Sequence, residues 1–227
     1  MAEPGTDVKP NLELIDADAY PAAVAARIAR SLPSDTGSVV VTGGTTAAKV
    51  YEHLDPQRWD GLDVFFSDER CVPPDHAESN FKMASEGFLG SSGAKVHRME
   101  GELDPSEAAK RYHDQISPFV SDRIDLLLLG MGADCHVGAL YPYSDALEAA
   151  DHCAAVQRPD GLQGLTLTPQ AMLSARSIRV LVTGAQKSEA LVRVTRGDED
   201  VAKCPGRLLV SHPDVTFWVD EGAASLL

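Results

Sequence analysis

Short apolar runs alternate along this chain with longer stretches in which apolar residues recur every three or four positions. The runs at 38–42, 62–66, 124–129, 178–182 and 215–219 are rich in Val, Ile, Leu and Phe. Segments of this length and composition are typical of buried strands. Four consecutive leucines end the run at 124–129, which predicts a strand buried on both faces.

The stretches between these runs predict helices. Over 18–32 the apolar residues Val24, Ile28 and Leu32 recur every fourth position, and further helices are expected over 45–54 and from Gln186 onward. Asp104 is followed by a proline and then by Glu107, the pattern of a capped helix start. Strands and helices therefore alternate, which predicts an α/β fold: an open, mostly parallel sheet with helices on both faces.

Several of the predicted strands end in glycine-containing or polar turns. These include Gly43-Gly44, the polar turn at 67–70, Gly130-Met131-Gly132 and Thr183-Gly184. Ligands of open α/β sheets bind beyond the carboxyl ends of the strands. We therefore expect segments 42–46, 67–70, 130–138 and 183–187 to meet at one site.

Length and composition are those of an ordinary globular domain. The chain has 227 residues, of which 44% are hydrophobic and 24% charged, and a domain of about 150 residues is typical. We expect a single α/β domain over 1–227, with residues 1–10 as a loose arm. The start lacks the basic and apolar regions of a signal peptide, and the four cysteines form no CxxC pair, so reduced thiols in the cytoplasm are expected.

The net charge of −14 limits the possible partners. Nucleic-acid binding needs a basic surface, and an anionic membrane would repel this protein. An anionic small molecule stays possible because a few local cations outweigh a distant negative surface. We expect a monomer or a small homo-oligomer.

Common cofactor and metal motifs are absent. The segment from Gly43 to Val50 lacks the glycine and the Ser or Thr that a Walker loop needs beside its lysine. The segment from Gly130 misses the third glycine of a dinucleotide fingerprint, and the histidines and cysteines lack zinc spacing, so no metal is expected. A thiol catalyst built on Cys135 and His136 is less favoured than a cysteine in the core.

Candidate chemistry gathers at the expected site. His136 follows a strand in a glycine-rich turn, where it acts either as a general acid–base group or as a histidine bonded to backbone. The spacing of Asp134 favours capping a following helix over orienting His136. Gly43, Gly44 and Thr45 open a helix, so their N–H groups either bind an anion or form an ordinary turn. Lys187 lies near a helix start, where its charge opposes the helix dipole, so it either faces a bound anion or is an ordinary exposed lysine.

Two blocks of the sequence resemble the 6-phosphogluconolactonases. Ser67 to Pro73, with Asn80 shortly after, resembles the block DERxVP…SN of that family, and Asp125 to Pro142 resembles DLxLLGMGxDGHxxSLFP. Thr166-Leu167-Thr168 and Gly184 to Lys187 match the later TLT and GxxK pieces, and Gly43-Gly44-Thr45 stands at the family's Gly-Gly-Ser/Thr loop. The matches stay in order over about residues 40–220.

The resemblance implies a modified Rossmann-like fold and hydrolysis of 6-phospho-D-glucono-1,5-lactone to 6-phosphogluconate in the pentose phosphate pathway, without metal or cofactor. It implies catalytic roles for His136 and Asp134. It implies substrate or phosphate binding by a second group of residues: Gly43, Gly44, Thr45, Asp68, Arg70, Asn80 and Lys187. Arg70 either pairs with its acidic neighbours or reaches the substrate, and Asn80 either contacts sugar or caps a turn.

The chain also departs from the family pattern. Cys135 replaces a glycine, Ala139 replaces a serine, and Gly164 stands where the family has an arginine expected on the phosphate. Two alternatives therefore stay open: a glucosamine-6-phosphate isomerase/deaminase-like enzyme of the same superfamily, and a non-catalytic sugar-phosphate-binding relative. Arg70 and Leu140-Tyr141-Pro142 favour the lactonase over the deaminase.

Overall fold

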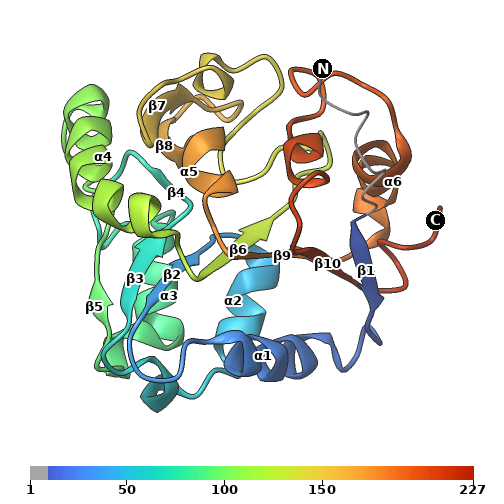
Figure 1. Cartoon of the computed structure of the whole chain (residues 1–227), viewed down its shortest axis with the longest axis horizontal. Coiled ribbons are helices and arrows are strands. Elements are labelled where there is room, and N and C mark those ends of the chain that lie inside the picture. The colour runs from blue at the N-terminus through green and yellow to red at the C-terminus, as the bar shows by residue number, and fades with distance from the viewer. Residues whose placement is uncertain (1–9) are drawn as a thin grey trace.

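A seven-stranded sheet forms the centre of the computed structural model, which describes residues 10–227 (Figure 1). Residues 1–9 of the expected loose arm lie outside the described residues. The strand order is β1-β10-β9-β6-β2-β3-β5, and every neighbouring pair is parallel. The strands are β1 (Asn11–Leu14), β2 (Ser38–Val41), β3 (Asp63–Phe66), β5 (Lys95–Val96), β6 (Leu126–Gly130), β9 (Ser177–Val182) and β10 (Val215–Val219).

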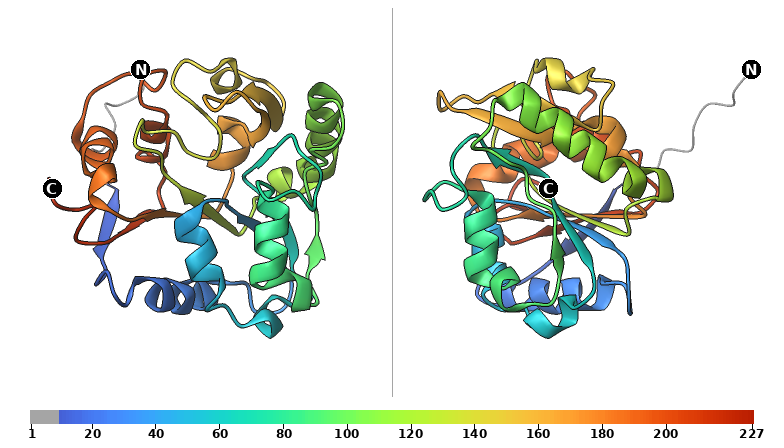
Figure 2. Two further views of the ribbon diagram at one scale, coloured as in Figure 1. Left: turned by 180° about the vertical axis from the view of Figure 1, so that it is seen from behind. Right: turned by 90° about the vertical axis from the view of Figure 1, so that its left-hand side faces the viewer.

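Helices cover both faces of this sheet, as the alternation of elements predicts. One face is covered by α1 (Tyr20–Ser31), α2 (Thr45–Tyr51) and α3 (Asn80–Gly87). The other is covered by α4 (Pro105–Asp122), α5 (Pro169–Leu173) and α6 (Ser188–Arg196). Figure 2 shows the two helical layers from behind and from the side.

The four leucines of β6 explain why that strand is apolar throughout. Leu126 and Leu128 pack into the core under α1 and α2, whereas Leu127 and Leu129 pack into the core under α4 and α6. Alternate side chains of a strand point to opposite faces, so both faces of this strand must be apolar.

A second, smaller sheet corrects the sequence prediction. Residues 67–70 were expected as a polar turn, but Asp68–Arg70 form strand β4, which pairs antiparallel with β8 (Gln163–Leu167), and β8 pairs with β7 (Cys153–Gln157). Asp68 lies opposite Thr166, and Arg70 lies opposite Gly164. The local composition is that of a turn, but pairing with a distant hairpin makes this segment a strand.

Local signals place the start of α4 correctly but not the end of α2. Asp104 accepts hydrogen bonds from the amides of Ser106 (3.0 Å) and Glu107 (3.2 Å), so the predicted cap of α4 is confirmed. Helix α2 ends at Tyr51 rather than near residue 54. The Tyr51 hydroxyl donates to the carbonyl of Thr42 (2.8 Å), which ties the end of α2 to the end of β2. Within residues 10–227, no helix combines the length and apolar character needed to cross a membrane.

Candidate functional site

A cavity of about 300 Å³ opens at the carboxyl ends of β2, β6 and β9. The cavity is lined by residues from all four segments that were predicted to meet, 42–46, 67–70, 130–138 and 183–187. Their predicted convergence is therefore confirmed. The order of strands reverses here, because β3 adds to one side of β2 and β6 to the other, and such a switch point is the usual ligand site of an open sheet. The hydroxyls of Thr46 and Thr183, 2.7 Å apart, join two of the loops.

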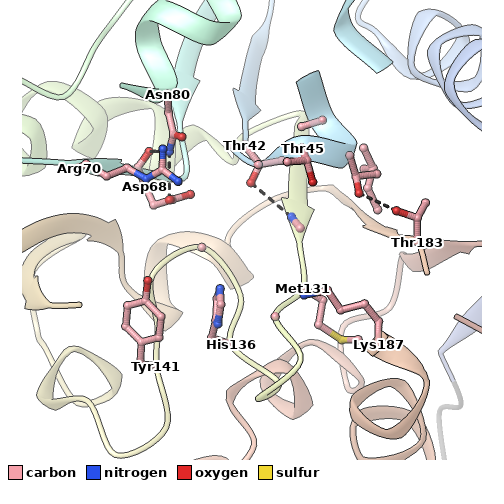
Figure 3. A pocket seen from close by; sticks show the side chains of 18 of the residues that line it. Thr42, Thr45, Asp68, Arg70, Asn80, Met131, His136, Tyr141, Thr183 and Lys187 are labelled. Atoms are coloured by element: carbon pink, nitrogen blue, oxygen red, sulfur yellow. Dashed lines mark hydrogen bonds between the residues drawn. The ribbon is translucent and has the colours of Figure 1, made fainter. Parts of the chain in front are cut away.

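His136 lies in the middle of the cavity wall in Figure 3. Its Nδ1 is 2.6 Å from Oδ1 of Asp134, and the same oxygen accepts from the His136 amide at 3.2 Å. A carboxylate can only accept, so Nδ1 carries a proton, and in the neutral form of the ring Nε2 has the lone pair. The contact with Asp134 therefore sets both the tautomer and the orientation of the ring.

Asp134 does not cap a helix, contrary to the spacing argument. The chain after it forms turns and isolated bridges through residue 140, so there is no helix to cap. Burial raises the pKa of Asp134, but the hydrogen bond and charge of His136 outweigh it and lower this pKa to about 2. Asp134 is thus a carboxylate at neutral pH, held on the histidine.

Cys135 stands between these two residues in a left-handed conformation, with φ of 74°. Only glycine adopts this region without cost, which accounts for the glycine in the family pattern. The side chain is fully buried, and Sγ donates to the carbonyl of Ala190 at 3.8 Å. Burial and a hydrogen bond with Cys204 raise the pKa of the thiol to about 12. The thiol lies outside the cavity, which argues against a thiol nucleophile.

The loop of Gly43, Gly44 and Thr45 lines the cavity where β2 ends and α2 begins. Gly44 has φ of 98°, a conformation that favours glycine. A Cβ on Gly43 would lie 2.1 Å from Oδ1 of Asn80, so this glycine lets the loop pack against α3. The first amides of α2 lie at the cavity, in the position from which helix amides bind anions.

Asp68 and Asn80 form one polar unit of the wall. The Asn80 amide donates to the Asp68 carbonyl (2.9 Å) and to its carboxylate (3.1 Å). The carboxylate also accepts from the Ser67 hydroxyl at 2.6 Å. Asn80 is the first residue of α3 rather than a turn cap, and its side chain orients Asp68.

Glu69 explains how this part of the wall is held. Its buried carboxylate accepts from the amides of Arg70 (2.8 Å), Asn80 (2.7 Å) and Phe81 (2.8 Å), and from the Ser79 hydroxyl (3.0 Å). Burial raises the pKa of Glu69, and these four donors lower it less than burial raises it. Glu69 was not predicted as a site residue, because in the sequence it cannot be told from other acidic residues until the position of α3 is known.

Arg70 lines the cavity but does not pair with its acidic neighbours Asp68 and Glu69. Its guanidinium donates to the carbonyl of Glu78 and lies 4.0 Å from the Glu78 carboxylate. The Nε of Arg70 is buried and has no hydrogen-bond partner in the described residues. Protein atoms enclose Nε, whereas Nη2 forms no hydrogen bond within residues 10–227 and is the donor left for the cavity.

Lys187 lies across the cavity from this group, beside Thr183 and Met131 in Figure 3. It precedes α6, in a single 3₁₀ turn at Ala185–Lys187. Burial lowers the pKa of Lys187, and the charge of Asp134 partly offsets this. Its amine forms no salt bridge within residues 10–227.

Tyr141 and Arg158 also line the wall, although neither was predicted from the sequence as a site residue. The Tyr141 ring lies 4.7 Å from the His136 ring, centroid to centroid, and Arg158 lies 6.0 Å from the Tyr141 centroid. Tyr141 stands within the block quoted above, so proximity to His136 was a usable signal. Arg158 follows β7, whose pairing the sequence pattern does not reveal. Among residues 10–227, no three or more His, Cys, Asp or Glu side chains are grouped to hold a metal ion.

Comparison with known proteins agrees with this geometry. The model of the family "Glucosamine-6-phosphate isomerases/6-phosphogluconolactonase" matches residues 16–218. A 6-phosphogluconolactonase of Synechocystis sp. is 32% identical over 203 residues, covering 84% of this chain and 85% of that protein. One of Treponema pallidum is 33% identical, covering 69% of this chain and 71% of that protein.

Solved structures show the same fold. The crystal structure of a 6-phosphogluconolactonase from Shewanella baltica superposes with a TM-score of 0.83 at 26% identity, covering 95% of this chain and all of that one. A monomeric glucosamine-6-phosphate deaminase reaches the same TM-score of 0.83 at 21% identity, covering 96% of this chain and 100% of that one, which bears on the fold alone. The chain belongs to the family of glucosamine-6-phosphate isomerases and 6-phosphogluconolactonases.

Proposed function

We propose that this protein hydrolyses 6-phospho-D-glucono-1,5-lactone to 6-phosphogluconate, a step of the pentose phosphate pathway. The observation that carries the proposal is His136, with Nδ1 bound to Asp134, in a cavity that cations line on both sides. The curated relatives named above are 6-phosphogluconolactonases, which supports the same reaction here.

The histidine suits both proton transfers of lactone hydrolysis. Water must lose a proton as it attacks the carbonyl, and the ring oxygen must gain one as it leaves. In our proposal Nε2 of His136 takes the first proton and returns it to the leaving oxygen. Asp134, ionised because its pKa is about 2, stabilises the imidazolium that forms between these steps.

The phosphate of the substrate would bind where the cations and the start of α2 come together. Lys187 approaches from one side of the Gly43–Thr45 loop, and Arg70 from the other. Gly43 of this loop packs on Asn80, on the side of Arg70. Thr46, which follows the loop, forms a hydrogen bond with Thr183, on the side of Lys187. A dianion at this place would gain from two charges and from the amides of the loop.

The growing negative charge on the carbonyl oxygen needs donors as well. Backbone amides of the glycine turns are natural candidates, but two of them are already used. The Gly130 amide donates to the Thr42 hydroxyl (3.3 Å), and the Gly132 amide to the His136 carbonyl (2.8 Å). The donors must therefore come from elsewhere in the wall.

A dehydrogenase-coupled lactonase assay, corrected for spontaneous hydrolysis, tests the proposal. His136→Asn should lower kcat by about 10²–10⁴-fold, the usual contribution of a general acid–base group. His53→Asn, at an exposed histidine away from the cavity, is the matched control and should be unchanged. EDTA should have no effect. A wild-type protein without activity on this lactone, or a His136→Asn variant of normal rate, would refute the proposal.

Activity on lactones with and without a phosphate tests whether Lys187 and Arg70 bind the phosphate. Lys187→Ala and Arg70→Ala should each lower kcat/KM by about ten- to a hundred-fold, the effect of losing a charge-assisted hydrogen bond. The loss should shrink on gluconolactone without a phosphate. An assay of glucosamine 6-phosphate deamination on the same samples tests the alternative enzyme of the family.

A further inference from the structure

A third cation lines the cavity besides Arg70 and Lys187, and no role has been assigned to it: Arg158. It follows β7 in the turn of the β7–β8 hairpin, where its amide donates to the carbonyl of Leu162 at 2.9 Å. Although it belongs to a surface hairpin, its side chain is only 10% exposed. The folded chain thus draws this arginine inward, towards the cavity.

The path of this side chain runs over Gly164. A Cβ on Gly164 would lie 3.0 Å from Cδ and 3.3 Å from Cγ of Arg158. A larger residue at 164 would therefore compete with Arg158 for the same space. In the sequence pattern that this chain resembles, an arginine stands at position 164, and a side chain of that size would need the space that Arg158 occupies here.

Asp160 orients the guanidinium of Arg158 but does not occupy all of its hydrogen-bond donors. Asp160 accepts from Nη2 at 2.7 Å and from Nε at 3.1 Å, which fixes one edge of the planar group. Nη1 donates no hydrogen bond within residues 10–227. The same charge lies 6.0 Å from the Tyr141 ring, which is itself next to His136.

Arg158 and Arg70 reach the same part of the cavity wall. Arg70 lies opposite Gly164 in the β4–β8 ladder, and Arg158 crosses Gly164 from the other strand of the hairpin. Arg70 adds Nη2, which forms no hydrogen bond within residues 10–227, as a second donor at this place. Two guanidinium groups with free donors, beside an amide-bearing loop, match a dianionic phosphate better than a neutral hydroxyl.

We propose that Arg158 binds the phosphate of the substrate together with Arg70, and that Gly164 is small in order to let it do so. The arginine that the family carries on β8 is thus supplied here from the end of β7. This inference rests on the proposed function for the identity of the substrate, and it adds a specificity residue to the site.

Steady-state kinetics of Arg158→Ala on two substrates test it. On the phosphorylated lactone, kcat/KM should fall by about ten- to a hundred-fold, mainly through KM. On gluconolactone without the phosphate it should change by less than about twofold. Arg158→Lys should fall between wild type and Arg158→Ala, because lysine keeps the charge but not the planar pair of donors.

Arg179→Ala is the matched control. Arg179 is similarly buried, at 15% side-chain exposure, and pairs with Asp214 at 3.0 Å, but it lies outside the cavity. It should keep wild-type kinetics on both substrates. Thermal unfolding of both variants separates lost binding from lost stability.

Calorimetric binding of 6-phosphogluconate gives a readout that does not depend on turnover. Its affinity should drop about ten- to a hundred-fold in Arg158→Ala. Unchanged affinity, or equal losses on the two lactones, would overturn the role of Arg158. Inactive wild-type protein that still binds 6-phosphogluconate through Arg158 would refute the lactonase proposal and leave the role of Arg158 standing.

Discussion

Asp134 and His136 show how two residues can determine each other's chemical state. Burial alone would raise the pKa of Asp134 above its ordinary 3.8, but the hydrogen bond and charge of the His136 ring, together with the backbone amides of His136 and Asp134, lower it to about 2. A depressed carboxyl pKa contributes stability that is present above 3.8 and is lost as the pH falls towards 2.

Removing the histidine should therefore change the titration of the carboxylate. In His136→Ala we expect the pKa of Asp134 to rise from about 2 towards its ordinary 3.8, because the ring is gone while burial and the backbone amides remain. Carbon-13 NMR of the aspartate carboxyls, followed over acidic pH, measures this. An unshifted Asp134 resonance would mean that His136 does not hold it.

Substitutions at Cys135 measure how much stability a side chain costs at a residue in a left-handed conformation. At an ordinary buried position glycine is less stable than alanine by about 0.5–1 kcal/mol. Here the φ of 74° costs a residue with a Cβ about 1–2 kcal/mol. We therefore expect Cys135→Gly to be at least as stable as Cys135→Ala in urea unfolding. Both should keep their kcat, because the thiol lies outside the cavity. A collapse of kcat in both variants would restore the thiol mechanism.

At the scale of elements, the start of α3 depends on one carboxylate. Glu69→Gln places an NH2 group against one of the amide or hydroxyl donors that now bind Glu69. An unsatisfied buried group of this kind costs about 1–3 kcal/mol. We expect this loss in urea unfolding, together with a higher KM, because Arg70 and Asn80 lose their common anchor.

Glu86→Gln, on the exposed side of the same helix, is the control and should change stability by less than about 0.5 kcal/mol.

The contribution of Glu69 to folding stability should also depend on pH, with a definite sign. Because burial raises the pKa of Glu69 above its ordinary 4.5, its contribution falls as the pH rises through the folded value. That dependence should be missing from Glu69→Gln. A variant as stable as wild type would show that α3 does not need this carboxylate.

At the scale of the whole molecule, the seven-stranded sheet separates two hydrophobic cores, one on each of its faces. Leu127 and Leu128 are neighbours in β6, both fully buried, yet they belong to different cores. Each Leu→Ala change should cost about 2–5 kcal/mol, the range for buried leucines. The same change at Leu14, which is 62% exposed on the edge strand β1, should cost less than about 0.5 kcal/mol. Chemical denaturation of the three variants compares them. A mild effect at either buried leucine would mean that one face of β6 is not packed.

Much of this architecture could be predicted from local patterns. The four leucines of β6, the spacing of Val24 and Ile28 in α1, and the cap at Asp104 each act within a few residues of chain. An element buried on one face shows a regular spacing of apolar residues, and one buried on both faces shows an unbroken apolar run. These elements could therefore be recognised in the sequence. The place of the site followed too, because parallel strands bring their carboxyl ends to one edge.

Other features depend on residues far apart in the chain. Strand β4 exists because β8 pairs with it, and the side chain of Arg158 reaches the cavity by a path over Gly164. The partner of Asp134 was misjudged because the turn after β6 never becomes a helix. By itself the sequence determined the layers, the strand ends and the kinds of chemistry available at them, since each depends on local periodicity and residue type. Only the tertiary structure decided which strands of the small sheet pair, how Glu69 anchors α3 and which arginines reach the cavity, because those outcomes depend on packing and hydrogen bonds between distant segments.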